Sequence, residues 1–193
     1  MMAGSARSVD IFISYSHKDE EFRAQLETHL ALLRRSGAIE TWHDRRIGAG
    51  EEWKNEIDAR LESSNLVLLL ISADFLASDY CYDVEMKRAL ERHEAGEAVV
   101  IPIILRTVDG WQSAPFAKFQ ALPKDGKPIT AWTDRDEAWA GVARGIRLAV
   151  DHLRARTAEP PELAAAPPPT PVQERAVDAA MPARAAVGRS TQL

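Results

Sequence analysis

The sequence predicts an α/β fold in which helices flank both faces of a doubly wound sheet of five parallel strands. Three observations support this prediction. Segments with strand-like and helix-like patterns alternate from residue 9 to residue 156. The connections between consecutive strands are too long for hairpins, so we expect crossovers between parallel strands. The composition then changes near Thr157 to a segment rich in proline and alanine, which marks the end of the domain.

The first part of the domain contains two predicted strands with a helix between them. The β-branched and aromatic run 9–15 predicts the first strand. Ser16 and Asp19 have the spacing of a capping box at the start of the following helix, and Gly37 supplies its end. Apolar side chains share one face of this helix: Phe22, Leu26, Leu30 and Leu33. A short second strand is predicted over residues 39–43.

The middle of the domain begins with a charged loop that contains two glycines, residues 44–50. A helix is predicted over residues 51–62. The continuous apolar run 66–71 predicts a third strand that is covered on both faces. We then expect a helix over residues 80–93 and a fourth strand over residues 98–105.

The last part of the domain begins inside the fourth strand, at Pro102. Proline cannot donate a ladder hydrogen bond, so we expect a bulge there. Residues 128–132 predict a short fifth strand, and residues 134–156 predict a final helix. One apolar stripe of that helix consists of Trp139, Val142, Ile146, Val150 and Leu153. The common order for five strands is flavodoxin-like, 2-1-3-4-5, which places a ligand at the carboxyl ends of the first and third strands.

The composition narrows the classes of function. A net charge of −5 and a pI near 5.6 argue against general nucleic-acid binding, which needs a basic excess. No run approaches the roughly 18 uncharged apolar residues of a membrane span. Cys81 is the only cysteine, which excludes an internal disulfide and a cysteine-rich zinc site. The histidines show no ligand spacing, so we expect no metal. The single cysteine and the lack of a secretory signal favour a cytoplasmic setting.

Both ends of the chain are expected to lie outside the domain at residues 9–156. Residues 1–8 lack the apolar run of a secretory signal and are predicted to be flexible. From Ala158 to the last residue the chain holds seven of its eleven prolines and ten alanines. Such a composition offers too little apolar surface to fold, so residues 157–193 predict a disordered linker or tail. We expect this segment to tether the domain to a fused or partner sensor domain.

The predicted strand ends lack several known signatures of ligand binding. The chain has neither the GxGxxG pattern of a dinucleotide cradle nor the GxxxxGK[ST] pattern of a P-loop. A phosphoacceptor receiver domain needs an aspartate at the end of the third strand, where this sequence has Ser72. The sequence therefore excludes a dinucleotide-binding cradle, a P-loop and a phosphoacceptor receiver domain.

Three segments together resemble the Toll/interleukin-1 receptor (TIR) domain family, over about residues 9–156. Residues 10–16 (DIFISYS) look like the signature of its first strand. Residues 44–50 (DRRIGAG) look like its BB loop. Residues 72–85 (SADFLASDYCYDVE) are similar to its third motif region, which in bacterial and plant members reads as Ser, an aromatic–Cys pair and then a glutamate. The resemblance is to bacterial members that cleave NAD⁺.

The resemblance implies that Glu85 is the catalytic residue of an NAD⁺ glycohydrolase. Cleavage of the nicotinamide–ribose bond builds positive charge on the sugar, as in glycoside hydrolysis. A carboxylate beside the ribose stabilises that charge, and nicotinamide leaves as a neutral molecule without a general acid. NAD⁺ would then be the substrate, and no cofactor is needed. The products would be nicotinamide and either ADP-ribose or a cyclic isomer of it.

Further residues are expected to bind substrate or to mediate assembly. The substrate-binding candidates are Ser14, Tyr15, Ser16, Trp42, Asp44, Arg46, Ile47, Gly50, Trp53, Tyr80 and Cys81. The assembly candidates in the BB-like loop are Arg45, Arg46, Ile47, Gly48, Ala49 and Gly50. The resemblance implies that neighbouring copies associate head to tail through this loop into open filaments and complete the site between them. The resemblance also implies a role in bacterial immunity.

Alternatives remain open at the level of single residues and of function. Glu85 could be a solvated helix charge paired with Arg88 or Arg92. Three residues separate Cys81 from Glu85, where plant-type members usually have two, so Asp83 is an alternative carboxylate. Tyr80 and Cys81 could also serve only to pack the helix. The competing function is a non-catalytic TIR–TIR interaction module, or a mimic that interferes with host signalling.

Overall fold

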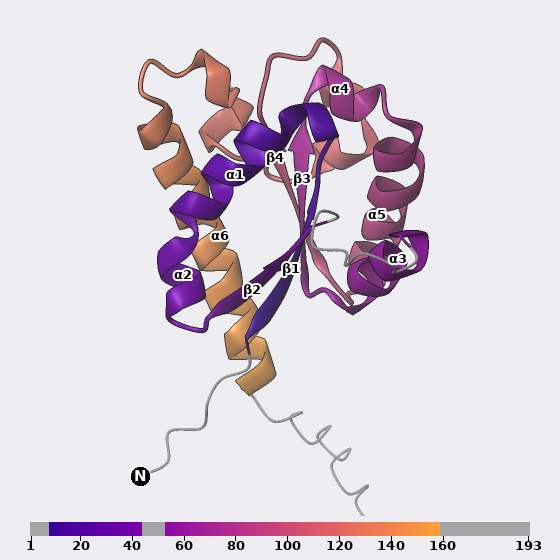
Figure 1. Cartoon of the computed structure of the whole chain (residues 1–193), viewed down its shortest axis with the longest axis vertical. Helices are drawn as coiled ribbons and strands as arrows, with labels where there is room; N and C mark the ends of the chain where they lie inside the picture. The colour runs from indigo at the N-terminus through magenta and orange to yellow at the C-terminus, as the bar shows by residue number, and fades with distance from the viewer. Residues whose placement is uncertain (1–7, 44–52, 159–193) are drawn as a thin grey trace, which may run out of the picture. The chain divides into compact units, whose positions relative to one another are not determined.

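The computed structural model describes residues 8–43 and 53–158. Residues 1–7, 44–52 and 159–193, which hold most of the predicted N-terminal segment, the BB-like loop and most of the predicted tail, lie outside the described residues. Within the described part, the sheet has four parallel strands in the order β2-β1-β3-β4 (Figure 1). Their bounds are β1 (Val9–Ser14), β2 (Ile39–Trp42), β3 (Leu66–Ile71) and β4 (Val99–Ile104). The α/β class, the parallel direction and the order of the first four strands match the prediction.

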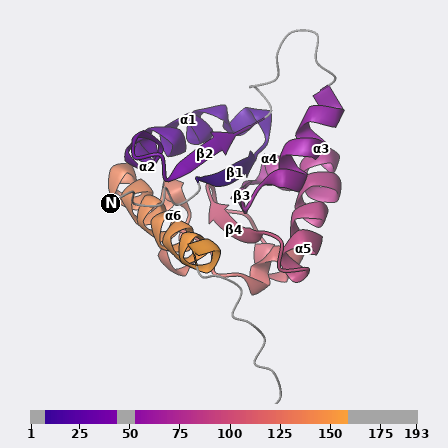
Figure 2. The ribbon, with the colours of Figure 1, turned by 90° about the horizontal axis from the view of Figure 1, so that it is seen from below.

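Helices cover both faces of this sheet (Figure 2). One face carries α1 (Glu20–His29), α2 (Ala31–Arg35) and α6 (Arg135–Ala158), and the other carries α3 (Trp53–Ser63) and α5 (Lys87–Glu94). The short helix α4 (Ala73–Leu76) follows β3 directly. The remaining described elements are η1 (His17–Asp19), η3 (Tyr80–Met86), η4 (Trp111–Ser113), η5 (Pro115–Lys118), η6 (Lys124–Gly126) and η7 (Ile129–Ala131).

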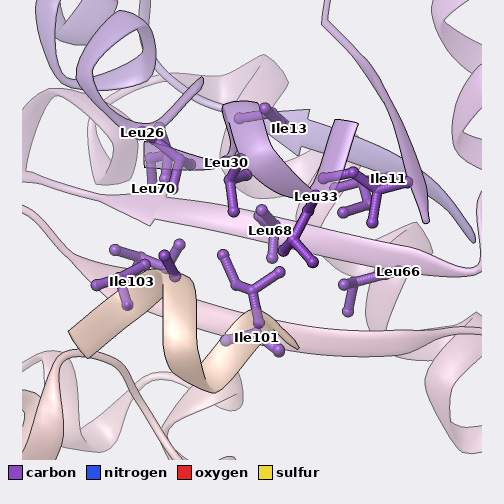
Figure 3. Packing of buried hydrophobic residues seen from close by; sticks show 14 of the residues in the cluster. Ile11, Ile13, Leu26, Leu30, Leu33, Leu66, Leu68, Leu70, Ile101 and Ile103 are labelled. Atoms are coloured by element: carbon purple, nitrogen blue, oxygen red, sulfur yellow. The ribbon is translucent and has the colours of Figure 1, made fainter. Parts of the chain in front are cut away.

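Side chains of each strand alternate between two apolar clusters because successive residues of a strand face opposite sides. Ile11 and Ile13 of β1 pack with the even-numbered residues of β3 beneath α1, α2 and α6 (Figure 3). Phe12 and the odd-numbered residues of β3 pack on the other side, against α3 and α5. Full burial of one such leucine or isoleucine contributes about 1.5–3 kcal/mol. This double-sided burial explains why β3 is a continuous apolar run.

The first helical segment is less regular than the sequence predicts. It contains the turn η1 and the helices α1 and α2, and Gly37 ends it with a φ of +68°. The predicted capping box is wrong, because the Ser16 side chain makes no cap hydrogen bond. The Asp19 carboxylate instead accepts a hydrogen bond from the Ser72 hydroxyl. The chain after β1 is thereby tied to the end of β3.

The predicted fifth strand is not present in the described structure. Residues 129–131 form the 3₁₀ turn η7, and the Thr130 amide donates a hydrogen bond to the carbonyl of Leu105, the residue after β4 (3.1 Å). The outer edge of β4 is met instead by Leu122, which forms a single parallel bridge with Ile103. Since Leu122 satisfies this edge with two backbone hydrogen bonds, no further strand is needed there.

The predicted bulge at Pro102 is also wrong. The register between β3 and β4 is unbroken from Leu66–Val99 to Ile71–Ile104. The Pro102 carbonyl accepts a hydrogen bond from the Leu122 amide at 2.8 Å, so its backbone faces away from β3. In a parallel strand the N–H and C=O of one residue point to the same side. The missing N–H of Pro102 therefore lies on the outer edge and costs no bond to β3.

Candidate functional site

A cleft of about 330 Å³ lies beside the carboxyl end of β1. One wall is the end of β1 and the turn after it, and the other is formed by η3 and the residue Ser78 before it. The residues that line it are Ile13, Tyr15, Ser16, His17, Lys18, Ser78, Tyr80, Cys81 and Glu85. Figure 1 shows α4 and the start of α1 at this end of the sheet. The position is the one that a doubly wound sheet predicts for a ligand.

Glu85 is a buried carboxylate in this cleft. The residue is 5% exposed, and its Oε2 accepts a hydrogen bond of 2.5 Å from the hydroxyl of Ser14. Ser14 is the last residue of β1 and pairs with Leu69 of β3, so the central sheet fixes its position. Burial of a carboxylate is costly without such polar partners. The structure thus brings together two candidates that are 71 residues apart in the sequence.

The alternative partners of Glu85 are engaged elsewhere. Arg88 donates hydrogen bonds to Glu62 and Glu91, on the solvent-exposed side of its helix. Arg92 is directed to backbone carbonyls at the end of α3. Glu85 therefore does not form the surface ion pair with Arg88 or Arg92 that the sequence allowed.

Asp83, the alternative carboxylate, has a different environment from Glu85. Its side chain is 52% exposed and forms an ion pair of 2.6 Å with Lys87, one helical turn further on. It is not among the described residues that line the cleft. Between the two acidic groups, only Glu85 is placed to meet a bound molecule.

Tyr15 and Cys81 connect the two walls of the cleft. The Cys81 thiol lies 3.5 Å from the Tyr15 carbonyl, and the Cys81 amide donates to the Ser78 hydroxyl at 3.3 Å. The Tyr15 hydroxyl donates to Glu20 at 2.6 Å, which directs the ring toward α1. Tyr80 packs against the second apolar cluster and also lines the cleft. These residues therefore combine packing with a place in the candidate site.

The aromatic candidates of the second strand and third helix are placed differently. Trp42 stacks on Phe12, with ring centroids 5.3 Å apart, and is not among the described residues that line the cleft. Trp53 is the first residue of α3, and its side chain is not described. The loop candidates Asp44, Arg45, Arg46, Ile47, Gly48, Ala49 and Gly50 lie outside the described residues. Their proposed roles in substrate binding and assembly stay predictions.

A polar network beside the cleft was missed by the sequence reasoning. The Arg106 network consists of Lys18, Asp19, Ser72, Asp74 and Arg106. Arg106 Nη2 donates to Asp19 Oδ1 at 2.6 Å and to Asp74 Oδ2 at 2.5 Å, and Lys18 Nζ donates to Asp74 Oδ1 at 2.9 Å. Lys18 and Arg106 hold the pKa of Asp74 below its usual range, and Asp74 in turn raises the pKa of Arg106. Asp19, Ser72 and Arg106 each follow a strand, which is the signal that could have linked them.

Two other kinds of site find no support in the described part of the chain. Residues 8–43 and 53–158 contain no group of three or more His, Cys, Asp or Glu residues that could hold a metal ion. Among the helices described there, none is long and apolar enough to cross a membrane.

Comparison with known proteins identifies the relatives of this chain. A family model described as "TIR domain" matches residues 11–142. The protein y4lF of Sinorhizobium fredii (strain NBRC 101917 / NGR234) is 54% identical over 184 residues, which are 95% of this chain and 54% of y4lF. The chain therefore spans about half the length of this curated relative.

A solved structure shares the fold of the domain. The TIR domain of the Toll-related receptor TRR-2 from Hydra magnipapillata is similar with a TM-score of 0.50 and 24% sequence identity. The match covers 72% of this chain and 99% of the receptor domain. At this level of identity the likeness shows the fold alone.

Proposed function

Since the chain belongs to the TIR domain family, we propose that it is an NAD⁺ glycohydrolase in which Glu85 is the catalytic carboxylate. The observation that carries this proposal is the buried Glu85 side chain, which lines the cleft and is held by Ser14. A buried and oriented carboxylate in a cleft is a costly arrangement for a merely structural charge.

The proposed chemistry requires little more than this carboxylate. The bond between the ribose C1′ and the nicotinamide nitrogen breaks, and its electron pair leaves with neutral nicotinamide. Glu85 stabilises the positive charge that develops on the ribose. Water then adds at C1′ and loses a proton, which gives ADP-ribose, or an adenine nitrogen adds there and gives a cyclic isomer.

The size of the cleft supports a site that one copy of the domain supplies only in part. Pockets for small ligands measure about 300–1,000 Å³, and 330 Å³ is at the lower end of that range. It suits the nicotinamide–ribose half of NAD⁺ better than the whole dinucleotide. We propose that residues 44–50 of a neighbouring copy complete the site in a head-to-tail assembly.

The assembly has its own test, which uses the loop outside the described residues. Ile47→Asp should reduce oligomer formation, measured by light scattering, and nicotinamide release together. Oligomers that persist while activity is lost would assign Ile47 to substrate binding instead. A sensor domain, fused or separate, would supply the clustering in a bacterial cytoplasm during an immune response.

The central experiment compares Glu85→Gln with Asp83→Asn. The full chain is incubated with NAD⁺ over a range of protein concentrations, with and without a crowding agent, and nicotinamide is measured by chromatography. We expect release by the wild type that rises with concentration, loss of release in Glu85→Gln, and near-normal release in Asp83→Asn. Both changes convert one carboxylate to an amide in the same segment, so the comparison isolates the position in the cleft.

Two outcomes would contradict this proposal in different ways. Release that survives Glu85→Gln would remove the residue assignment while leaving the activity. An assembled wild-type protein that releases no nicotinamide would remove the enzyme and favour the non-catalytic interaction module.

A further inference from the structure

The two walls of the Glu85 cleft come from separate parts of the chain. The first wall ends at Lys18, in the turn after β1. The second wall begins at Ser78, just after α4. Ser14–Glu85 and Tyr15–Cys81 contacts join the walls directly. The width of the cleft at its other end depends on contacts between the turn after β1 and α4.

The Arg106 network supplies these contacts. Asp19 directly follows the first wall, and Asp74 lies in α4, which leads into the second wall. One nitrogen of Arg106, from the chain after β4, donates to both carboxylates, at 2.6 and 2.5 Å. Arg106 itself is not among the described residues that line the cleft. It joins the two walls from outside.

Arg106 contributes most of the electrostatic stabilisation in this network. The Asp19 residue is 0% exposed, and a buried carboxylate without a cation is strongly unfavourable. Lys18 bridges to Asp74 as well, but its side chain is 76% exposed, and such surface pairs contribute little. Without Arg106, Asp19 would keep the Ser72 hydroxyl but lose its ionic partner. The turn after β1 would then move outward to hydrate Asp19, and the cleft would open.

We propose that Arg106 is a positioning residue that sets the separation of the two cleft walls through Asp19 and Asp74. Its effect on catalysis rests on the proposed NAD⁺ cleavage, whereas its effect on the cleft does not. Arg106 acts through the walls and does not touch substrate.

Cys81 provides a reporter of cleft opening that needs no enzymatic activity. It is the only cysteine of the chain, it is 6% exposed, and it lines the cleft. The rate of its alkylation by iodoacetamide can be measured by mass spectrometry on the full chain at low urea concentrations. A local opening gives a rate that is independent of urea, whereas global unfolding gives one that rises steeply with urea. The urea dependence of the rate therefore distinguishes alkylation through local opening of the cleft from alkylation through global unfolding.

We expect Arg106→Met to raise the urea-independent alkylation rate about tenfold, because coupling of this kind changes local equilibria by that order. Arg106→Lys should restore much of the wild-type rate, since an ammonium group can still bridge the two carboxylates. Asp74→Asn, a milder change at a partly exposed residue, should give a smaller increase in the same direction and serves if Arg106→Met does not fold.

Arg92→Met is the matched control. Arg92 is a buried arginine that binds the end of α3, and it is not among the described cleft residues. It should raise only the urea-dependent rate. If Arg106→Met changes only the urea-dependent alkylation rate of Cys81, or changes neither rate, Arg106 has no positioning role.

Kinetic measurements then connect the cleft to the reaction. A wider cleft loses contacts that bind substrate and transition state alike, so we expect kcat/KM of Arg106→Met to fall roughly tenfold, the order of the coupling between the walls. The rise in KM should exceed the fall in kcat, in contrast to Glu85→Gln, where kcat falls. A wild type without activity would refute the proposed function and leave the alkylation result standing. A kcat/KM equal to that of the wild type in Arg106→Met would overturn the positioning role.

Discussion

Replacement of Ser14 by alanine tests the bond on which the candidate site depends. The Ser14 hydroxyl donates to the buried Glu85 carboxylate at 2.5 Å, and both residues are at least 95% buried. A hydrogen bond to a charged group contributes about 1.5–3 kcal/mol. Ser14→Ala should therefore lower the free energy of unfolding by about 1.5–3 kcal/mol, measured by urea denaturation. If the bond also orients Glu85 in the transition state, the same energy corresponds to a loss of roughly 10- to 150-fold in kcat.

A double-mutant cycle decides whether this loss belongs to the bond. Ser14→Ala, Glu85→Gln and the double variant are compared with the wild type, both in urea unfolding and in nicotinamide release. We expect a coupling energy of about 1 kcal/mol or more between the two positions, as for groups in direct contact. A coupling energy near zero, with additive losses, would show that Ser14 does not act on Glu85, and the proposed orientation of the carboxylate would be wrong.

Three further predictions concern charges away from the cleft. Desolvation and the facing Glu40 raise the pKa of Asp10, so its ionisation opposes folding. Because Asp10 is exposed and water screens the repulsion, Asp10→Asn should add only about 0.2–0.5 kcal/mol to the free energy of unfolding at pH 7, and this gain should be lost below about pH 4. A gain that persists at pH 3 would contradict this. Arg92→Met removes the arginine donor from the buried Ser64 carbonyl, while the Leu61 carbonyl keeps its hydrogen bond from the Ser64 hydroxyl, so the variant should cost about 1–3 kcal/mol in urea denaturation. A cost below about 0.5 kcal/mol would refute the structural role. Arg88 holds the pKa of Glu62 below its usual 4.5, so the stability that Glu62 adds should be present above that pH and fade as the pH falls further. A stability difference between wild type and Glu62→Gln that is constant from pH 7 to pH 2.5 would argue against that ion pair.

Local pattern predicted the central strands well because each is defined by its own burial. The apolar run 66–71 coincides with β3 to the residue, since both faces of this strand lie in the core. The same reasoning failed at residues 128–132. Whether a short β-prone segment pairs depends on a free strand edge, and Leu122 already occupies the edge of β4. Nothing in the local sequence reports that competition.

The candidate site was predicted in part, for a similar reason. The predicted strand order placed a ligand at the carboxyl ends of the first and third strands. Glu85 was singled out by the resemblance to the TIR family, and its contact with Ser14 was not predicted. Asp19 was interpreted as a helix-capping residue, whereas its carboxylate binds Ser72 and an arginine 87 residues away. Such a role follows only from the three-dimensional arrangement of loops after different strands.

The π-helical winding of η3 bears on how this site tolerates changes in length. Cys81 and Glu85 both lie in this segment, four positions apart. In an α-helix each residue turns by about 100°, so one additional residue would rotate a glutamate well away from its original direction. The wider i→i+5 turn fits more residues into each revolution and reduces that rotation. Glu85, four positions after Cys81, thus faces Ser14 while Cys81 and Glu85 both line the cleft. A one-residue change of spacing within this segment would rotate the carboxylate less than it would in an α-helix.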